Sequence, residues 1–457
     1  MNRLTRRGFI TAGAALAASP VSAREHADLT LILMGDLHSG YRWSSRLLAA
    51  VRQAAGSASG EVRIIVNGDV FEHNNVVARK NGGLIDLALL RSFSAIAPTF
   101  VTIGNHDSDL FDPALFASDV LQSGAVLLTD IVDPRTARPY GSVAARFTVG
   151  RCSVAIAALG TPLPSLYPAA YRAFYQVPNP VAYARTALPG LLDDADLKIV
   201  LIHAGFVADR SVMPHLRGDV LLHGSHDHLR FTHPFATPDA RGLHIQSGSW
   251  SNAFQIVDVR FRPDGPTMKA RDVVLDSKST SDPELQALVQ HELDSNLGSQ
   301  DKAVLGHLGR AFTLDESALL AARWIREQAG ADVGIISHTT CGDGFPSGAV
   351  TRYDLSAFLR FDGNIVTVEI PPERVALLSS RCNQFDGHTP YDRRTGDYLY
   401  ATPFPIRPVG SVKVAINAYP VSSNANRLAF LGWDATEISP TKLPLISQII
   451  ADGLARS

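Results

Sequence analysis

The chain has 457 residues, of which 46% are hydrophobic and 19% are charged, an ordinary composition for a globular protein that excludes a disordered or fibrous chain. The length is about three times the ~150 residues of one typical domain, which predicts two or three domains. The formal net charge is −2 without a basic block, so we expect no binding to a nucleic-acid polymer. Three cysteines are too few for a disulfide framework. Cys341 and Cys382 either pair in an oxidising compartment or are buried free thiols.

Residues 1–23 predict a targeting segment rather than a part of the fold. A twin-arginine pattern at residues 5–10 precedes an apolar stretch that ends at Ala18, which is too short to span a bilayer comfortably. Small residues at 21–23 are typical of a cleavage site. Removing this segment, with its three arginines, changes the formal net charge from −2 to −5. We expect a periplasmic or secreted protein, cleaved near Ala23, that engages the twin-arginine export machinery and keeps no stable membrane anchor. The alternative is an accidental Arg-Arg pair before a short core helix.

From Leu29 to about Phe261, short apolar runs alternate with helical patterns. The apolar runs predict strands at residues 29–34, 62–66, 99–103, 154–159, 198–202, 219–222 and 242–246. Helical patterns follow the first two strands, at 44–55 and 83–94. Strands that are apolar throughout are typical of sheets covered on both faces, so the alternation predicts an α/β sheet between layers of helices.

The pattern changes twice after this region. Residues 277–300 are polar, with leucines at a helical spacing, which predicts a connector helix. From about Asp301, a helix is predicted at 316–329 and strands at 332–337, 365–370 and 412–417. The predicted units are therefore a signal peptide, a first domain, a connector helix and a second domain, at residues 1–23, 24–275, 276–300 and 301–457.

Possible metal ligands follow four of the predicted strands. They are Asp36 and His38, then Asp69, then Asn105 with His106 and Asp107, and finally His203 together with the pair His226 and His228. Open α/β sheets bind their ligands at the carboxyl ends of the strands, so we expect these side chains to converge. Glycines at 35, 68 and 104 let the backbone turn sharply at these ends.

The residue types in this set predict the chemistry of the site. Carboxylate, imidazole and amide ligands suit first-row divalent ions and zinc, so Mn, Zn, Fe and Co remain alternatives. With one shared aspartate, seven of these residues give each of two ions four protein ligands and leave positions for water and substrate. The seven are Asp36, His38, Asp69, Asn105, His203, His226 and His228. Two ions roughly 3.5–4 Å apart stabilise both the attacking and the leaving oxygen of an in-line displacement. The ordered set therefore indicates a dinuclear hydrolytic site.

This ordered set resembles the calcineurin-like metallophosphoesterases. In the second half, residues 331–336, 348–355 and 360–364 resemble the second domain of the secreted 5′-nucleotidase / UDP-sugar hydrolase family, and residues 246–250 resemble the end of its first domain. The resemblance covers nearly the whole mature chain and is more specific in the first domain. It implies an α/β (α+β) fold, in which a four-layer metallophosphoesterase β-sandwich flanked by helices precedes a smaller, divergent α/β C-terminal 5′-nucleotidase-like domain.

The resemblance also implies a role for each residue of the set. One ion would be held by Asp36, His38, Asp69 and His228, and the other by Asp69, Asn105, His203 and His226. His106 would face the substrate, stabilise the pentacoordinate phosphorus and help to protonate the leaving alkoxide. Asp109 would orient His106, although a loop or helix cap is an alternative role. His73 occupies a position where the family often has glycine, and is either an added pocket group or a surface residue.

The substrate pocket matches the family less well. Phe361 and Tyr419 match two rings that sandwich a nucleobase in the family; the alternative is that both pack in the core. Gly342 occupies the position of a family arginine, and residues 423–426 replace a glycine-rich run. A bidentate arginine is not replaced by neutral groups without cost, so Arg360, Arg381 or Arg407 are candidates to supply its charge.

These observations lead to one function and two alternatives. The leading hypothesis is a periplasmic 5′-nucleotidase-like phosphatase, which releases phosphate from nucleotides or similar small-molecule phosphoesters by attack of a metal-activated hydroxide. The second keeps this machinery but assigns another substrate, such as a cyclic nucleotide, a sugar or glycerol phosphate, or a sulfate–thiol ester. The third is a periplasmic binding or structural protein without catalysis. The complete set of ligands argues against it.

Overall fold

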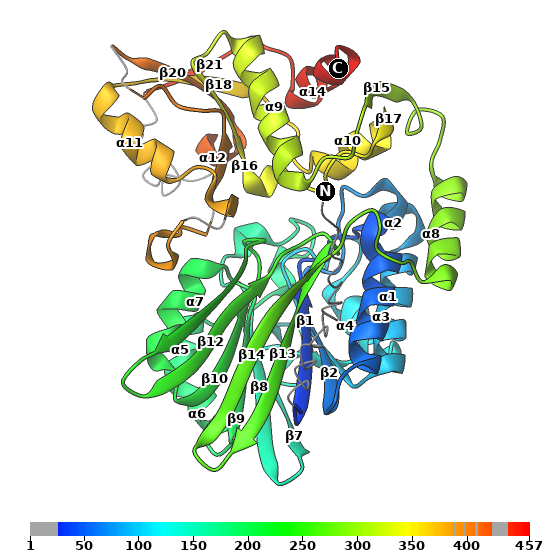
Figure 1. Cartoon of the computed structure of the whole chain (residues 1–457), viewed down its shortest axis with the longest axis vertical. Coiled ribbons are helices and arrows are strands. Elements are labelled where there is room, and N and C mark those ends of the chain that lie inside the picture. Colours follow the sequence, from blue (N-terminus) through cyan, green and yellow to red (C-terminus); the bar gives the residue numbers. More distant parts are fainter. Residues whose placement is uncertain (1–25, 387–388, 397, 407–409, 423–436) are drawn as a thin grey trace, which may run out of the picture.

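The structure is a computed structural model that describes residues 26–386, 389–396, 398–406, 410–422 and 437–457. The predicted targeting segment, Arg407 and residues 423–426 lie outside this range. The described residues form a larger lower domain and a smaller upper one in the view of Figure 1. Within the described ranges, none of the helices has the length and apolar character needed to span a membrane.

Two six-stranded sheets form the centre of the first domain. One has the order β14-β13-β1-β2-β3-β4 and the other β11-β12-β10-β9-β8-β7. The strands of the first sheet are β1 (Leu29–Gly35), β2 (Glu61–Asn67), β3 (Thr99–Thr102), β4 (Val126–Leu128), β13 (Ala253–Arg262) and β14 (Gly265–Val274). Those of the second are β7 (Ala144–Val149), β8 (Cys152–Leu159), β9 (Leu197–Ile202), β10 (Gly218–Gly224), β11 (Arg230–Ala236) and β12 (Ala240–Ser247). A small hairpin joins β5 (Val132–Asp133) to β6 (Arg138–Pro139).

The central strands of each sheet run parallel. β1 to β4 pair in parallel, as do β8, β9, β10 and β12 in the other sheet. Their carboxyl ends therefore gather at one edge of the domain. Every residue of β1 is buried, because one face packs on helices and the other on the second sheet, which explains its unbroken apolar sequence.

Helices cover the outer face of each sheet, as Figure 1 shows. The first sheet is covered by α1 (Tyr41–Gly56), α2 (Val76–Asn81), α3 (Leu84–Ile96), α4 (Pro113–Gln122) and α8 (Pro283–Asn296). The second is covered by α5 (Pro180–Thr186), α6 (Leu188–Leu192) and α7 (Phe206–Val212). A third apolar cluster lies between the two sheets. The four-layer architecture predicted from the resemblance is confirmed.

Helix α8 corresponds to the predicted connector helix and joins the helical layer of the first domain. Its Leu285 and Val289 are buried in the same apolar cluster as α1 and α3. Ser45 of α1 also donates a hydrogen bond to Gln286, with an O–O distance of 2.7 Å. The helix is thus packed against the first domain rather than suspended between the two.

The second domain is built on a five-stranded sheet with the order β19-β16-β20-β18-β21. Its strands are β16 (Val333–Ser337), β18 (Ile365–Ile370), β19 (Leu399–Ala401), β20 (Val412–Asn417) and β21 (Ile438–Pro440), and β15 (Val304–Leu308) pairs separately with β17 (Gly348–Thr351). The helices are α9 (Leu314–Ala329), α10 (Arg352–Phe358), α11 (Pro372–Ser380), α12 (Tyr419–Ser422) and α14 (Ile446–Ala455). Cys341 and Cys382 are both buried free thiols.

Candidate metal centre

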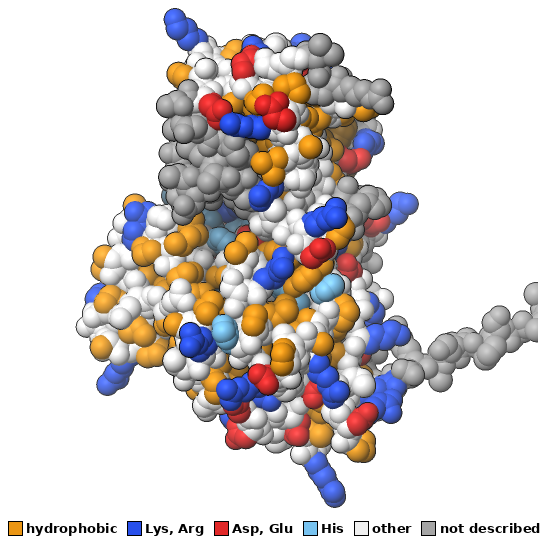
Figure 2. Space-filling model, turned by 90° about the vertical axis from the view of Figure 1, so that its left-hand side faces the viewer, with side chains coloured by type: hydrophobic (Ala, Val, Ile, Leu, Met, Phe, Trp, Pro, Cys, Tyr) orange, Lys and Arg blue, Asp and Glu red, His pale blue; other side chains and the backbone are white. Residues whose placement is uncertain are grey.

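The predicted metal ligands all lie in loops that begin where strands of the two sheets end. Asp36 and His38 follow β1, Asp69 follows β2 and Asn105 follows β3. From the second sheet, His203 follows β9, and His226 with His228 follows β10. On the face drawn in Figure 2, histidine side chains are visible at the junction of the two domains.

These loops hold several non-glycine residues in the left-handed backbone region. Five of the predicted ligands have positive φ angles, namely Asp36 (51°), His38 (48°), Asp69 (51°), His226 (85°) and His228 (58°). Such angles are uncommon outside glycine and cluster at functional sites, where the surrounding structure enforces them. Glycines allow the close approach between loops, since a Cβ at Gly104 would lie 2.2 Å from a carboxylate oxygen of Asp69.

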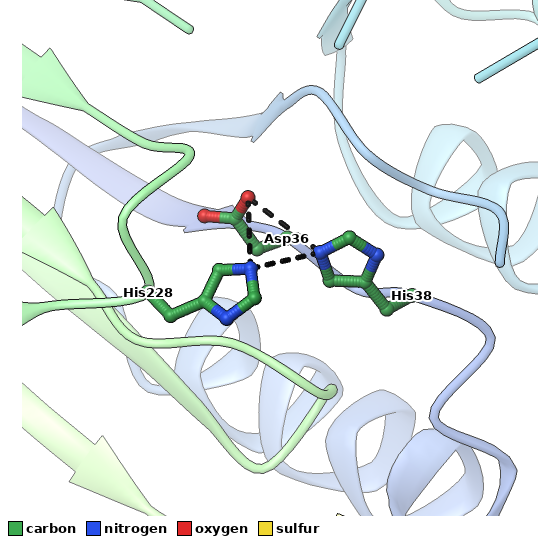
Figure 3. Close-up of side chains that lie close together, drawn as sticks. All are labelled: Asp36, His38 and His228. Carbon is green, nitrogen blue, oxygen red and sulfur yellow. Dashed lines mark hydrogen bonds and ion pairs between the residues drawn. The ribbon is translucent and has the colours of Figure 1, made fainter. Parts of the chain in front are cut away.

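The first group of ligands consists of Asp36, His38 and His228 (Figure 3). The Nε2 atoms of the two imidazoles are 3.0 Å apart, and they lie 3.8 and 3.9 Å from Oδ1 of Asp36. Ser225 donates a hydrogen bond to the other oxygen of Asp36, so its hydroxyl orients the carboxylate.

The second group consists of Asp69, His203 and His226. Oδ2 of Asp69 lies 3.1 Å from Nε2 of His203 and 3.7 Å from Nε2 of His38. Asp69 is therefore positioned between the two groups, as a bridging ligand requires. Asn105 joins this group, since its Oδ1 is 2.8 Å from Nδ1 of His226.

The donor set fits two divalent ions. Nδ1 of His203 lies 2.8 Å from the carbonyl oxygen of Asn67, which fixes the ring so that Nε2 faces the site. This buried Nε2 has no hydrogen-bond partner among the described residues. Burial opposes charge on His203, but Asp69 and Asp36 raise its pKa to about 10, so an ion would replace a proton there. The structure brings the seven residues together in the two groups that the resemblance implies, and their coordination of ions stays a prediction.

His106 and Asp109 form a pair beside these groups. Nδ1 of His106 is 2.7 Å from Oδ2 of Asp109, and its backbone N–H donates to Asp69. Burial alone would lower the pKa of His106, yet Asp109 and Asp69 raise it to about 9. Asp109 also accepts the backbone N–H of His73, so it contacts both the imidazole and the neighbouring loop, and its orienting role stays a prediction. The His73 side chain is exposed.

Glu72 is a site residue that the sequence analysis missed. It is buried, lies 3.3 Å from Nδ1 of His38 and pairs with Arg360 of the second domain at 2.6 Å. Arg360 in turn lies 3.2 Å from Nε2 of His106. Glu72, His106 and Asp109 also cluster closely enough to hold an ion, but here the guanidinium of Arg360 supplies the positive charge. An acidic residue in the loop after β2, three positions beyond Asp69, was the available signal.

The other predicted substrate residues lie in different places. The rings of Phe361 and Tyr419 are stacked, with centroids 5.1 Å apart and an interplanar angle of 10°. Arg381 follows α11, where its carbonyl accepts the N–H of Leu399 in β19, and it is not one of the residues that line the cavity beside His38. A Cβ at Gly342 would lie 2.1 Å from the carbonyl oxygen of Ala357, so this position excludes the arginine of the family.

Comparisons with known proteins agree with this geometry. Residues 29–148 match the family model described as calcineurin-like phosphoesterase. No curated protein sequence matches the chain. This match covers part of the first domain, and it includes the loops that carry Asp36, His38, Asp69 and Asn105.

Solved structures match nearly the whole chain. A 5′-nucleotidase precursor from Thermus thermophilus is 14% identical, with a TM-score of 0.60 over 94% of this chain and 96% of that chain. A sulfate thiohydrolase, SoxB, from the same organism is 13% identical, with a TM-score of 0.59 over 94% of each. A 5′-nucleotidase from Candida albicans is 12% identical, with a TM-score of 0.58 over 95% and 98%. At these identities the matches establish a shared fold, including the 5′-nucleotidase-like second domain.

Proposed function

We propose that the protein is a dinuclear-metal phosphoester hydrolase that releases phosphate from nucleotides or similar small organophosphates. The observation that carries this proposal is the arrangement of two ligand groups joined by Asp69, with the His106–Asp109 pair beside them. Divalent ions held there supply Lewis-acid polarisation of the phosphoryl group and lower the pKa of water.

The residues of the chain supply the remaining parts of the reaction. His106, oriented by Asp109, provides a proton for the leaving oxygen. Arg360 places a second positive group 3.2 Å from His106, where it stabilises the charge that develops on the phosphoryl oxygens. Both groups are largely buried, and a site that excludes water strengthens such interactions.

A second candidate keeps the same site and changes the substrate. The narrow separation of Phe361 and Tyr419 and the close packing at Gly342 favour a substrate other than a nucleotide. A sulfate–thiol ester belongs to this candidate, since SoxB shares the fold.

The test is to incubate the purified, metal-loaded protein with AMP, a UDP-sugar, a 2′,3′-cyclic nucleotide, glycerol 3-phosphate, p-nitrophenyl phosphate and thiosulfate. The amounts of phosphate and sulfate released from each compound are then measured. We expect phosphate from at least the monoesters. Selective release from AMP, with a KM that Phe361→Ala raises far more for AMP than for p-nitrophenyl phosphate, would support the nucleotidase. Sulfate alone would support the thiohydrolase, and no product from any compound would contradict both.

We also propose that the protein acts in the periplasm after twin-arginine export. The support is the sequence of residues 1–23, which lie outside the described residues. Replacing Arg6 and Arg7 by lysine should leave the protein inside the cell, and cell fractionation with detection of the chain measures this. Periplasmic location of that variant would contradict the proposal.

A further inference from the structure

A cavity of about 230 Å³ lies beside the candidate metal centre, between the two domains. Its wall includes His38 and Trp250 from the first domain and Tyr353, Asp354 and Arg360 from the second. The Trp250 ring stacks on His38 at 4.8 Å, so the cavity adjoins a predicted ligand. Its volume is below the ~300–1,000 Å³ of pockets for drug-sized ligands, which suits a compact group.

Arg360 lies between this cavity and the stacked rings of Phe361 and Tyr419. The guanidinium carbon of Arg360 lies 5.1 Å from the centre of the Trp250 ring and 5.3 Å from that of Phe361. The organic part of a substrate therefore has two sides available, one lined by Trp250 and one by Phe361 and Tyr419.

The space between the rings of Phe361 and Tyr419 is too narrow for a nucleobase. A base between two rings needs about 3.4 Å on each face, the rise of stacked bases, which requires ring centres roughly 7 Å apart. Those of Phe361 and Tyr419 are 5.1 Å apart and nearly parallel, so each ring already contacts the other. The cavity beside Trp250, in contrast, is open without any movement of these two rings.

The polar groups of the cavity wall favour a ligand rich in hydroxyl groups. Arg42 lies between the carboxylates of Asp343 and Asp354, at 3.3 and 3.5 Å, and Arg360 pairs with Glu72. Three carboxylates thus face two guanidinium groups, and this excess of negative charge disfavours a second anionic group on the ligand.

Hydrogen-bonding capacity remains on the same wall. The Tyr353 hydroxyl has one described contact, at 3.5 Å from Asn75, and Oδ1 of Asp354 has only the 3.5 Å contact with Arg42 among the described residues. A hydroxyl donor and a carboxylate acceptor that line the same cavity as the Trp250 ring match the alternating donors, acceptors and apolar faces of a sugar or polyol.

We propose that this cavity binds the alcohol part of the substrate, and that the substrate is a monophosphate ester of a compact sugar or polyol rather than a nucleotide. This inference rests on the proposed phosphoester hydrolysis and specifies its substrate class. The phosphate lies at the metal centre, and the alcohol extends past Trp250 towards Tyr353. Arg360 lies at the boundary between the two parts.

The test compares glucose 6-phosphate, glycerol 3-phosphate and AMP as substrates of the metal-loaded protein and of two cavity variants. Tyr353→Phe removes the hydroxyl, and Ala357→Leu fills the cavity from α10. Tyr183→Phe and Ala182→Leu on α5 are the matched controls. Inorganic phosphate, which has no alcohol part, serves as an inhibitor that reports on the metal centre.

We expect kcat/KM for a sugar or polyol phosphate to exceed that for AMP at least tenfold. Each cavity variant should lower it about tenfold, while the controls and the inhibition constant of phosphate stay unchanged. A preference for AMP, or cavity variants without effect, would overturn this inference and leave the proposed hydrolysis standing. An equal loss of phosphate inhibition would place the effect at the metal centre and also overturn it. No phosphate from any substrate would overturn both proposals.

Discussion

His106 is held between groups of opposite charge. Asp109 favours the protonated ring, whereas Arg360, 3.2 Å from Nε2, opposes it. Asp109 thus raises the pKa of the ring, whereas the neighbouring cation lowers it and so favours transfer of the proton. This placement suits a residue that gives a proton to a leaving group.

His106→Ala should lower turnover about 10²–10⁴-fold, because it removes the proton donor, while both metal groups remain intact. Metal content of the purified variant and phosphate release measure the two effects. Asp109→Asn, which keeps a hydrogen-bond acceptor but removes the charge, should show a smaller loss. Loss of bound metal in His106→Ala would mean that the ring is a ligand, and unchanged turnover would remove its assigned role.

Glu72→Gln should weaken metal binding about 10–100-fold, because the carboxylate next to Nδ1 of His38 fixes the ring that faces the ion. Calorimetric titration of the metal-free protein with Mn²⁺ or Zn²⁺ measures the affinity for the ion. Glu61→Gln, which alters an exposed ion pair with Arg63 on β2, is the matched control. Equal affinities in both variants would contradict the role of Glu72.

Asp130 makes the stability of the fold depend on pH. It is buried, one oxygen accepts the N–H of Gly160, and the other has no partner among the described residues. Burial raises its pKa to about 7 from 3.8. Between these values the folded chain binds more protons than the unfolded chain, so this carboxyl lowers the free energy of unfolding as pH rises.

Asp130→Asn should remove this decrease in the free energy of unfolding as pH rises. Relative to the wild type, the variant should gain on the order of 2–4 kcal/mol between pH 4 and pH 8, at about 1.4 kcal/mol per pKa unit. Urea unfolding at several pH values measures the difference, with the exposed Asp239→Asn as control. A difference that is independent of pH would show that Asp130 is ionised throughout.

Which site residues could be predicted from the sequence depends on how far apart their partners lie along the chain. The seven predicted ligands directly follow apolar strands, so a local pattern was enough to predict that they converge. The role of Glu72 depends on Arg360, which lies 288 residues away. The close packing of Gly342 against α10 is likewise a tertiary contact that no local pattern records.

At the scale of elements, the strands that could be predicted contain a buried apolar run, although β13, which also has one, was missed. β1 and β9 are buried along their entire length, and a continuous apolar run reveals such strands. β14 was missed because none of its residues is fully buried, so it has no apolar run. It is recognisable only through its pairing with β13.

One short element joins the second domain to the second sheet of the first. The 3₁₀ turn Tyr391–Arg393 places the hydroxyl of Tyr391 2.5 Å from Nδ1 of His244 in β12. His244 is fully buried, and its Nε2 lies 3.0 Å from Asp209 of α7. The Tyr391 ring stacks on His233 at 3.7 Å.

Tyr391→Phe should destabilise this contact by about 1–3 kcal/mol, because Nδ1 of His244 loses its partner in a buried setting. Hydrogen exchange of residues 389–396 should accelerate, and metal content should not change. Tyr171→Phe is the control, since the Tyr171 hydroxyl has no described hydrogen bond. Unchanged exchange would show that the ring stacking alone holds the turn.

At the scale of the whole molecule, the two domains divide the site between them. All seven predicted ligands belong to the first domain, and Arg360 and Tyr353 approach from the second. Contacts such as Glu72–Arg360 and His244–Tyr391 join the domains on different sides of the site. The two-domain organisation was visible in the sequence, but this docking was not, because it depends on side chains more than 140 residues apart.

Removal of the ions should therefore destabilise the first domain. A chelator should abolish activity and lower the melting temperature, and an ion at 100 times its Kd should restore about 2.7 kcal/mol. Thermal unfolding with and without added Mn²⁺ or Zn²⁺ measures this. Asp69→Asn, which removes the charge of the shared ligand, should show a much smaller shift. Equal shifts in both proteins would place ion binding elsewhere.

The origin of the ligands in both sheets has a consequence for how the chain folds. His38 and His228 are 190 residues apart and meet only after the sheets have packed against each other. We therefore expect the complete site to form late in folding, after the two sheets have packed. Interactions that form after the transition state slow unfolding and leave the folding rate nearly unchanged. Ions should therefore lengthen the lifetime of the folded protein without hastening its formation.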